Sequence, residues 1–266
     1  QGGLIGQDAS RGNPFSQLAV QEFRVSTSNF KAEYEQASAA IISAITRSGG
    51  NDFHGDVLFT FQNQALMARN YFATLRGELE QPKELRSQFG ASLGGPVVKD
   101  KLHFFVTYEG NVQNRANVVV LGNPTADNQA RFGGFEGNFG SPFREHLGFA
   151  KLSWMPAGNQ TLDVSASLRT ETDIRSFGGQ TSFESAENVR NNVITASARH
   201  QLRLGALTNE ATLQYLGSRF NPTSTNVNAV GQDYEGVIRI GGRDTSQDIR
   251  QQALTLRNDT TFANFN

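Results

Sequence analysis

The chain has 266 residues, enough for one large β domain or two ordinary ones. Charged residues make up 18% of it and the net charge is -1, so electrostatics give no case for a nucleic-acid partner. The absence of cysteine excludes disulfides, thiolate metal sites and cysteine nucleophiles. With 27 glycines and 20 phenylalanines, the composition favours two-faced strands and many turns over a helical bundle or disorder.

The first fifty residues differ in pattern from the remainder. Residues 20–25, VQEFRV, alternate apolar and polar side chains and predict a short strand. A stretch of helical propensity follows from Phe30 to Ala40. The uncharged, β-branched run from Ala40 to Thr46 then predicts a strand that is buried on both sides. Because the turn SGGND ends this pattern, we expect a domain boundary near residue 51.

From residue 52 onwards, alternation with a period of two predicts eight strands, the first over 53–62 and the eighth over 252–262. One face of these strands is apolar, and its aromatic side chains are Phe59, Phe61, Phe104, Tyr108, Trp154 and Tyr215. The opposite face is polar and includes Glu109, Asp163, Arg169 and Arg199. Residues 110–145 interrupt the strands, and we expect them to form one large irregular loop that contains Phe132, Phe135, Phe139 and Phe143.

The predicted connections alternate between long and short. Long ones are expected near Arg76, Asn123, Ser182 and Val227, and short turns near Lys99, Gly158 and Gly205. A soluble sandwich has no reason to collect its long loops at one end, whereas outer-membrane barrels have long extracellular loops and short periplasmic turns. The sequence has no run of about 18 apolar residues, which a transmembrane helix would need. A strand of a membrane barrel needs only about ten alternating residues, so a barrel is not excluded.

Two blocks of the sequence resemble a known family. The first comprises Gln21, Glu22 and Phe23, then residues 29–34 with Gln36 and Ala37, then 45–48 and the motif NDFHG at 51–55. The second is SQFGASLGGPVVKDKLHFFVTYEG at 87–110. Together they resemble TonB-dependent outer-membrane receptors of Gram-negative bacteria, and most of all the Oar-like branch, at the point where the plug domain ends and the barrel begins.

The resemblance implies that residues 1–51 are the C-terminal part of a plug and that residues 52–266 are the N-terminal part of a large outer-membrane β-barrel. The fold class is then mainly β, with antiparallel up-and-down strands. Eight strands enclose too little space for a plug, so we expect the sheet to stay open, with its first and eighth strands as edges. The chain starts at Gln1 without a signal peptide or Met, and we expect it to be an internal piece of a longer protein.

The function implied is energy-dependent transport of an unknown solute, inward or outward, through a plugged barrel of the bacterial outer membrane. The partners are outer-membrane lipid, the solute, and TonB, which would contact a segment upstream of Gln1. An alternative is an adhesion or interaction protein that uses the long loops, or an export-associated barrel. A weaker alternative is a soluble β-sandwich enzyme, which detergent dependence of the purified protein would exclude.

No enzymatic chemistry is predicted. His54, His103, His146 and His200 lie on different strands without metal-binding spacing, and no serine lies in a G-x-S-x-G motif, so we expect no catalytic residue, metal site or cofactor. The four phenylalanines of the large loop are candidates for contact with a ligand, or for packing against neighbouring loops. The inward Glu109, Asp163, Arg169 and Arg199 are expected either to touch a solute or to hydrogen-bond to the plug and to one another.

Overall fold

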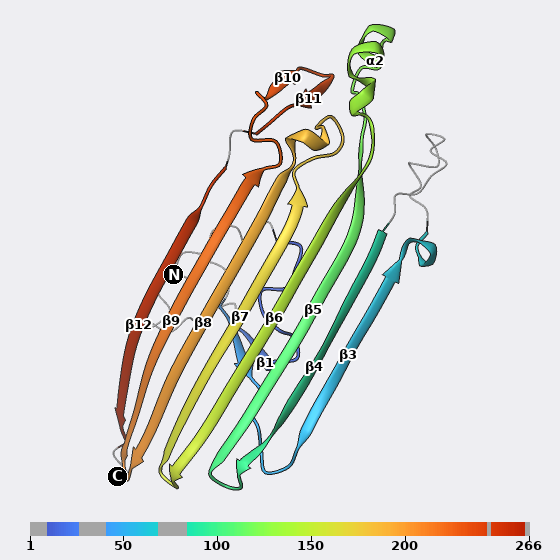
Figure 1. Ribbon diagram of the computed structural model, residues 1–266. Helices are drawn as coiled ribbons and strands as arrows, with labels where there is room; N and C mark the ends of the chain where they lie inside the picture. The colour runs from blue at the N-terminus through green and yellow to red at the C-terminus, as the bar shows by residue number, and fades with distance from the viewer. Residues whose placement is uncertain (1–9, 27–40, 69–83, 244–245, 264–266) are drawn as a thin grey trace.

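Eight long antiparallel strands form one curved sheet, which dominates the structure (Figure 1). The computed structural model describes residues 10–26, 41–68, 84–243 and 246–263. Each strand pairs with its neighbours in the chain, in the order β12-β9-β8-β7-β6-β5-β4-β3. Their bounds are β3 (His54–Asn63), β4 (Glu84–Val98), β5 (Leu102–Val119), β6 (Gly137–Ala157), β7 (Gln160–Arg175), β8 (Glu187–Leu204), β9 (Leu207–Ser224) and β12 (Ile249–Phe262).

The sheet is not closed. Among the described residues, β3 pairs only with β4, and β12 pairs only with β9, so each of these strands is an open edge there. This confirms the expectation of an unclosed antiparallel sheet of eight strands. Each edge leaves a row of backbone N–H and C=O groups available for pairing with a further strand.

Residues 110–145 do not form the single irregular loop that was predicted for them, so that prediction was wrong. β5 continues to Val119, and β6 already begins at Gly137, so Phe139 and Phe143 lie on a strand. Continuous pairing explains the difference, because Asn117 lies opposite Phe139 and Gln113 opposite Phe143 in the β5–β6 register. Backbone hydrogen bonds to a paired strand hold this segment extended even where its glycines and proline break the apolar alternation.

The remaining connections keep the expected asymmetry. Tight turns join β4 to β5, β6 to β7 and β8 to β9 at one end of the sheet. Longer segments at the other end carry α2 (Ala126–Phe132) with the short helical turn η2 (Gly133–Phe135), the turn η3 (Phe183–Ser185), and the hairpin of β10 (Gln232–Tyr234) and β11 (Ile238–Ile240). The turn η1 (Gln64–Leu66) follows β3, and the loop expected near Arg76 lies outside the described residues.

Three of the long connections share a hydrophobic core, which we call the loop module. Its buried members are Val119, Leu121, Phe132, Phe177, Ala186 and Ile238. Backbone hydrogen bonds join the connections as well: the N–H of Val120 donates to the carbonyl of Gly179, and the N–H of Gly122 to that of Val237. The β5–β6, β7–β8 and β9–β12 connections therefore form one packed unit rather than three independent loops.

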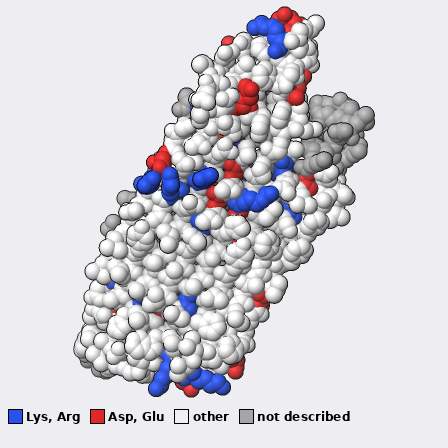
Figure 2. Space-filling view, in the orientation of Figure 1, with Lys and Arg blue, Asp and Glu red and all other residues white. Residues whose placement is uncertain are grey.

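The outer face of the sheet has a broad uncharged band below a row of charges (Figure 2). The aromatic residues predicted to face the membrane all point outward; Phe104 is partly buried and Phe59, Phe61, Tyr108, Trp154 and Tyr215 are exposed. On β6 and β7 the apolar band ends at Gly148 and Leu168, and polar or charged outward residues follow toward the long connections. No helix in the described ranges is long and apolar enough to cross a membrane.

The N-terminal part of the chain lies behind the sheet in Figure 1. Residues 10–19 run along the inner face and lead into a separate two-stranded sheet of β1 (Val20–Ser26) and β2 (Ile41–Thr46). Both strands were expected, but Ala44 and Ile45 of β2 are exposed rather than buried on both sides, because among the described residues β2 pairs only with β1. The helical segment expected at residues 30–40 lies outside the described residues.

Candidate functional site

Acidic and basic side chains are buried where residues 10–18 meet the inner face of the sheet. This position follows from the alternation of the strands, which turns every second side chain of β5, β6 and β7 inward. We call these wall residues the anchor cluster: Glu109, Glu145, Arg169, Glu171 and Asp173. All five are buried, and each has an ionisable side chain. Such groups are stable away from water only when they are paired or hydrogen-bonded.

Glu109 holds the second half of the N-terminal segment. Its Oε1 accepts a hydrogen bond from the Ser16 hydroxyl at 2.6 Å and another from the Leu18 N–H at 2.8 Å. The Ser16 hydroxyl also lies 2.8 Å from that of Thr107 on the same strand. A carboxylate that accepts a backbone N–H fixes the path of the chain as well as its side chains.

Arg169 on β7 is the wall residue at the centre of the contacts made by the first half of the N-terminal segment. It is 3% exposed and donates to Glu145 at 3.2 Å, to Glu171 and to the Ser10 hydroxyl. The Ser10 hydroxyl donates in turn to Glu171 at 2.6 Å. One guanidinium thus bridges two wall carboxylates and the N-terminal segment, so the segment is held by a buried ionic network rather than by apolar packing.

Two further contacts tie the segment to β6 and β7. The Asn13 N–H donates to Glu145 at 3.1 Å. Arg11 ion-pairs with Asp173 at 3.4 Å and donates to the Ser141 hydroxyl at 2.9 Å. Each half of the segment therefore has at least one hydrogen bond to a wall carboxylate, and the first half also has an ion pair.

Burial makes the ionised forms of two of these carboxyl groups costly. Glu145 and Asp173 lie on the long-connection side of the outward apolar band, beyond Gly148 on β6 and Leu168 on β7. Burial raises the pKa of Glu145, although the Asn13 N–H and Arg169 oppose that shift. Burial also raises the pKa of Asp173, with Arg11 as the main opposing charge. Both groups therefore bind a proton more readily than an exposed carboxyl group does.

Gly12 lets the segment approach the wall closely. A Cβ built at this position would lie 2.1 Å from Oε1 of Glu145, well inside van der Waals contact. The Glu145 side chain has little room to withdraw because Arg169 and the Asn13 N–H hold its two oxygens. A residue without a side chain is therefore needed where the backbone passes over the ionic network.

Of the four residues predicted to face the lumen, only Glu109 and Arg169 contact the N-terminal segment. Asp163 and Arg199 also point inward but lie nearer the short-turn end. Asp163 accepts from the Ser153 hydroxyl at 2.6 Å and ion-pairs with Lys151 at 3.7 Å. Arg199 donates to Glu210 at 2.7 Å. The wall residues Glu145, Glu171 and Asp173 were not predicted. Glu145 lies in the segment that was expected to be a loop. Glu171 and Asp173 continue the odd-numbered alternation that placed Arg169 inward, and that pattern would have found them.

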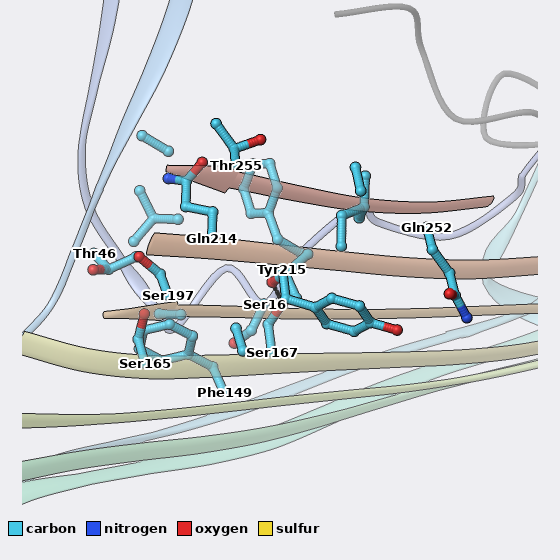
Figure 3. Close-up of a pocket in the computed structure, with 18 of the residues that line it drawn as sticks. Ser16, Thr46, Phe149, Ser165, Ser167, Ser197, Gln214, Tyr215, Gln252 and Thr255 are labelled. Atoms are coloured by element: carbon cyan, nitrogen blue, oxygen red, sulfur yellow. Dashed lines mark hydrogen bonds between the residues drawn. The ribbon is translucent and has the colours of Figure 1, made fainter. Parts of the chain in front are cut away.

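A cavity of about 740 Å³ lies beside the anchored segment (Figure 3). Phe15, Ser16 and Ala19 line it on the N-terminal side, Thr46 lies at the end of β2, and the inner faces of β6 to β9 and β12 complete it. No lining residue among those described carries a charge. Much of the wall consists of hydroxyl and amide groups, including Ser165, Ser167, Thr195, Ser197, Gln214 and Thr255. The cavity can therefore offer hydrogen bonds without offering a charge.

The four phenylalanines proposed for ligand contact are largely packed. Phe132 belongs to the buried core of the loop module, with Phe135 and Phe139 packed against that core. Phe139 stacks on Phe183 with ring centroids 5.3 Å apart. Phe143 points inward and is fully buried. The structure does not gather these rings at one exposed surface.

The four histidines do not converge either, because each lies on a different strand. His103 contacts the Asn51 side chain at 2.8 Å, and His146 contacts the Tyr108 hydroxyl at 2.7 Å. Among the described residues, no group of three or more His, Asp and Glu side chains has an arrangement that could hold a metal ion. The contacts of these histidines are hydrogen bonds to neighbouring side chains.

Comparison with known proteins agrees with this geometry. The chain is 35% identical to the TonB-dependent transporter Oar of Myxococcus xanthus over 101 residues, which are 36% of this chain and 9% of that relative. The outer membrane transporter YddB of Escherichia coli superposes with a TM-score of 0.70 at 10% identity, covering 93% of this chain and 33% of that one. A mutant of the ferric enterobactin receptor PfeA of Pseudomonas aeruginosa superposes at 0.52 with 18% identity, covering 89% of this chain and 31% of that one.

These relatives are transporters and receptors rather than enzymes, in agreement with the expectation that the chain is not an enzyme. The chain spans less than a tenth of the length of Oar and about a third of each of the two solved structures. The family described as the outer membrane beta barrel domain matches residues 45–264, which is most of the chain. The chain therefore belongs to the outer membrane beta barrel domain family, is similar to TonB-dependent transporters, and is located in the bacterial outer membrane.

Proposed function

We propose that this chain is part of a TonB-dependent transporter, in which residues 1–51 belong to the plug and residues 52–266 to the barrel wall. The observation that carries the proposal is the ionic attachment of residues 10–18 to the inner face of an open sheet. A plug must close the pore at rest and move when energy arrives. A hydrogen-bonded network is suited to that task because each of its groups can be rehydrated when the segment leaves.

The cavity beside the segment indicates how a solute would pass. Its hydroxyl and amide lining would exchange hydrogen bonds with a solute, and its lack of charge would keep the solute from being held by strong ion pairs. We propose that a solute moves along this side of the plug when TonB-delivered energy displaces the segment. Outer-membrane lipid would contact the opposite face of the strands, where Phe59, Phe61, Phe104, Tyr108, Trp154 and Tyr215 point outward.

A reversible tether tests this proposal. The Ser16 and Thr107 hydroxyl oxygens are 2.8 Å apart and join the segment to the wall. Because the chain has no cysteine, the pair Ser16→Cys and Thr107→Cys would introduce one disulfide that locks the segment in place. The matched control is Asn209→Cys with Thr260→Cys, a cross-strand pair whose side chains hydrogen-bond at 2.8 Å but which both lie on the wall, away from the cavity lining.

Each cysteine pair is introduced into the full-length protein. The variants are expressed in cells from which the native gene for this protein has been deleted. Cells are given a uniformly ¹³C-labelled cell hydrolysate, and labelled species inside the cells are profiled by mass spectrometry. We expect at least one species to enter only with TonB present, to be excluded by the 16–107 tether, and to enter again after reduction. Uptake that is the same with the 16–107 disulfide formed or reduced, or that does not require TonB, would contradict the proposal.

The loop module supports a second candidate function. Its core of Val119, Leu121, Phe132, Phe177, Ala186 and Ile238 holds three connections in one shape, as an adhesive surface requires. An adhesion protein would mediate attachment of cells to a surface and would import no labelled species. Attachment that persists with the 16–107 tether oxidised, together with an absence of TonB-dependent import, would favour this function over transport.

A further inference from the structure

Four arginines point outward from four strands of the sheet just above the apolar band. They are Arg144 on β6, Arg190 on β8, Arg219 on β9 and Arg250 on β12, and we call them the arginine belt. Figure 2 shows basic side chains, with acidic ones among them, in a row across the outer face. The mostly uncharged area between this row and the charged short-turn end is the part of the face that fits a lipid interior.

The belt is a local excess of positive charge. Arg219 and Arg250 are direct cross-strand partners, an arrangement in which like charges destabilise a sheet. Asp248 is the one carboxylate that ion-pairs with any of the four among the described residues, and it is shared, at 2.7 Å from Arg219 and 3.0 Å from Arg250. Among the described residues, the belt therefore holds more guanidinium groups than ion-paired carboxylates.

The other two guanidinium groups have no anionic partner in the described part of the chain. Arg144 donates to the backbone carbonyls of Gln113 and Phe143 and to the Asn114 side chain, all of which are neutral. Arg190 is exposed, and its side chain makes no hydrogen bond or ion pair with any described residue. An external anion would relieve the repulsion that the chain itself leaves uncompensated.

The register fixes the distance of the belt from the apolar surface. Gln252, Gly217 and Ile194 occupy the next outward positions beneath Arg250, Arg219 and Asn192, and Leu254, Tyr215 and Ala196 follow one step further. An anion bound at the belt would therefore lie directly above the lipid chains that cover this band. A lipid headgroup reaches that position, whereas a freely diffusing anion has no reason to favour it.

We propose that the arginine belt binds the phosphate groups of lipid headgroups in the leaflet on the long-connection side of the membrane. Guanidinium is planar and presents pairs of N–H donors that match two phosphate oxygens, so arginine is better suited to this contact than lysine. The inference goes beyond solute transport and does not depend on which solute is carried or on whether the plug moves.

The test uses the full-length protein purified in neutral detergent, with lipid A as the probe because its sugar headgroup carries two phosphates. Native mass spectrometry measures the apparent affinity for lipid A and for the same lipid after removal of both phosphates. The test variant is Arg190→Gln/Arg219→Gln/Arg250→Gln. The control is Arg199→Gln/Arg203→Gln/Arg257→Gln, which removes the same charge near the short-turn end. A third variant with lysine at 190, 219 and 250 retains the charge but loses the paired donors.

We expect the unmodified protein and the control to prefer the diphosphorylated lipid, and the glutamine variant to bind it at least about tenfold more weakly, since each basic group near an anionic lipid adds to the attraction. The lysine variant should fall between them, which separates lost binding from lost folding. Equal binding by the glutamine variant and the control would overturn the proposal. So would equal binding of the phosphate-free lipid, or full displacement of lipid A by 1 mM inorganic phosphate, which would assign the belt to a soluble anion.

Discussion

Replacing Arg169 with Met should release the N-terminal segment from the wall. The change removes the one cation that contacts both Glu145 and Glu171, whose side chains are almost entirely shielded from solvent. Breaking a buried ion pair by removing one partner costs about 3 to 5 kcal/mol, because the remaining charge stays buried without compensation. At about 1.4 kcal/mol per factor of ten, the equilibrium for lifting the segment should shift by roughly 10²- to 4 × 10³-fold.

A thiol at position 19 reports this shift. Ala19 is 4% exposed, so a cysteine placed there in the cysteine-free chain should react with a maleimide mainly when the segment lifts. The labelling rate of the full-length protein in detergent then measures the open fraction. The matched control is Arg199→Met, which breaks a half-exposed ion pair with Glu210 and should change the rate by less than about tenfold.

A second exchange separates charge from packing. Adding Glu145→Gln and Glu171→Gln to Arg169→Met leaves no buried charge of this triad and should return the labelling rate most of the way toward that of the parent. The reasoning fails if Arg169→Met labels no faster than Arg199→Met. It also fails if the triple variant labels as fast as Arg169→Met alone, because lost packing would then explain the release.

Three further outcomes are expected. An arginine at outward Val164 should cost about 2 to 4 kcal/mol in urea unfolding from lipid vesicles, whereas an arginine at inward Ser165 should be tolerated; equal costs would mean that the two faces are misassigned. In whole cells, a membrane-impermeant thiol reagent should label a cysteine at Asn123 but not one at Gly158, and the reverse would invert the barrel. Because burial raises the pKa of Glu145, the contribution of this group to stability should be largest in acid and be lost as pH rises through the raised pKa. Glu145→Gln should therefore flatten the change in melting temperature between pH 5 and 7. An unaltered pH dependence of the melting temperature would contradict this.

The alternation of side chains was enough to predict eight strands and the two faces of their sheet, although not the full length of β5 and β6. A period of two is a local property, and for β7 it placed Val164 outward and Arg169 inward without any knowledge of the partner strands. The same rule failed at residues 137–145, where glycine and proline break the pattern. There the strand is specified by pairing with β5, which is a long-range property that no short window of sequence contains.

The anchor cluster could be predicted only in part for a related reason. Inward-facing charge was visible at Glu109 and Arg169, but their partners Ser10 and Ser16 lie about 90 to 160 residues away in the sequence. A serine in a polar, glycine-rich segment gives no sign of which wall residue it will meet. Gly12 is similar, since its requirement for a missing side chain appears only once Glu145 lies beneath it.

The shared core of the loop module couples the sequence variation of three surface segments. Phages, antibodies and competing bacteria recognise exposed loops of outer-membrane proteins, so such loops are under pressure to vary. Here a substitution that disturbs Phe177 or Ile238 would reshape all three connections at once, because both side chains belong to one core. Exposed positions such as Asn123 and Glu235 can change freely, while the six core positions must change in concert. Escape from recognition should therefore proceed through the outer residues of the module and leave its interior fixed.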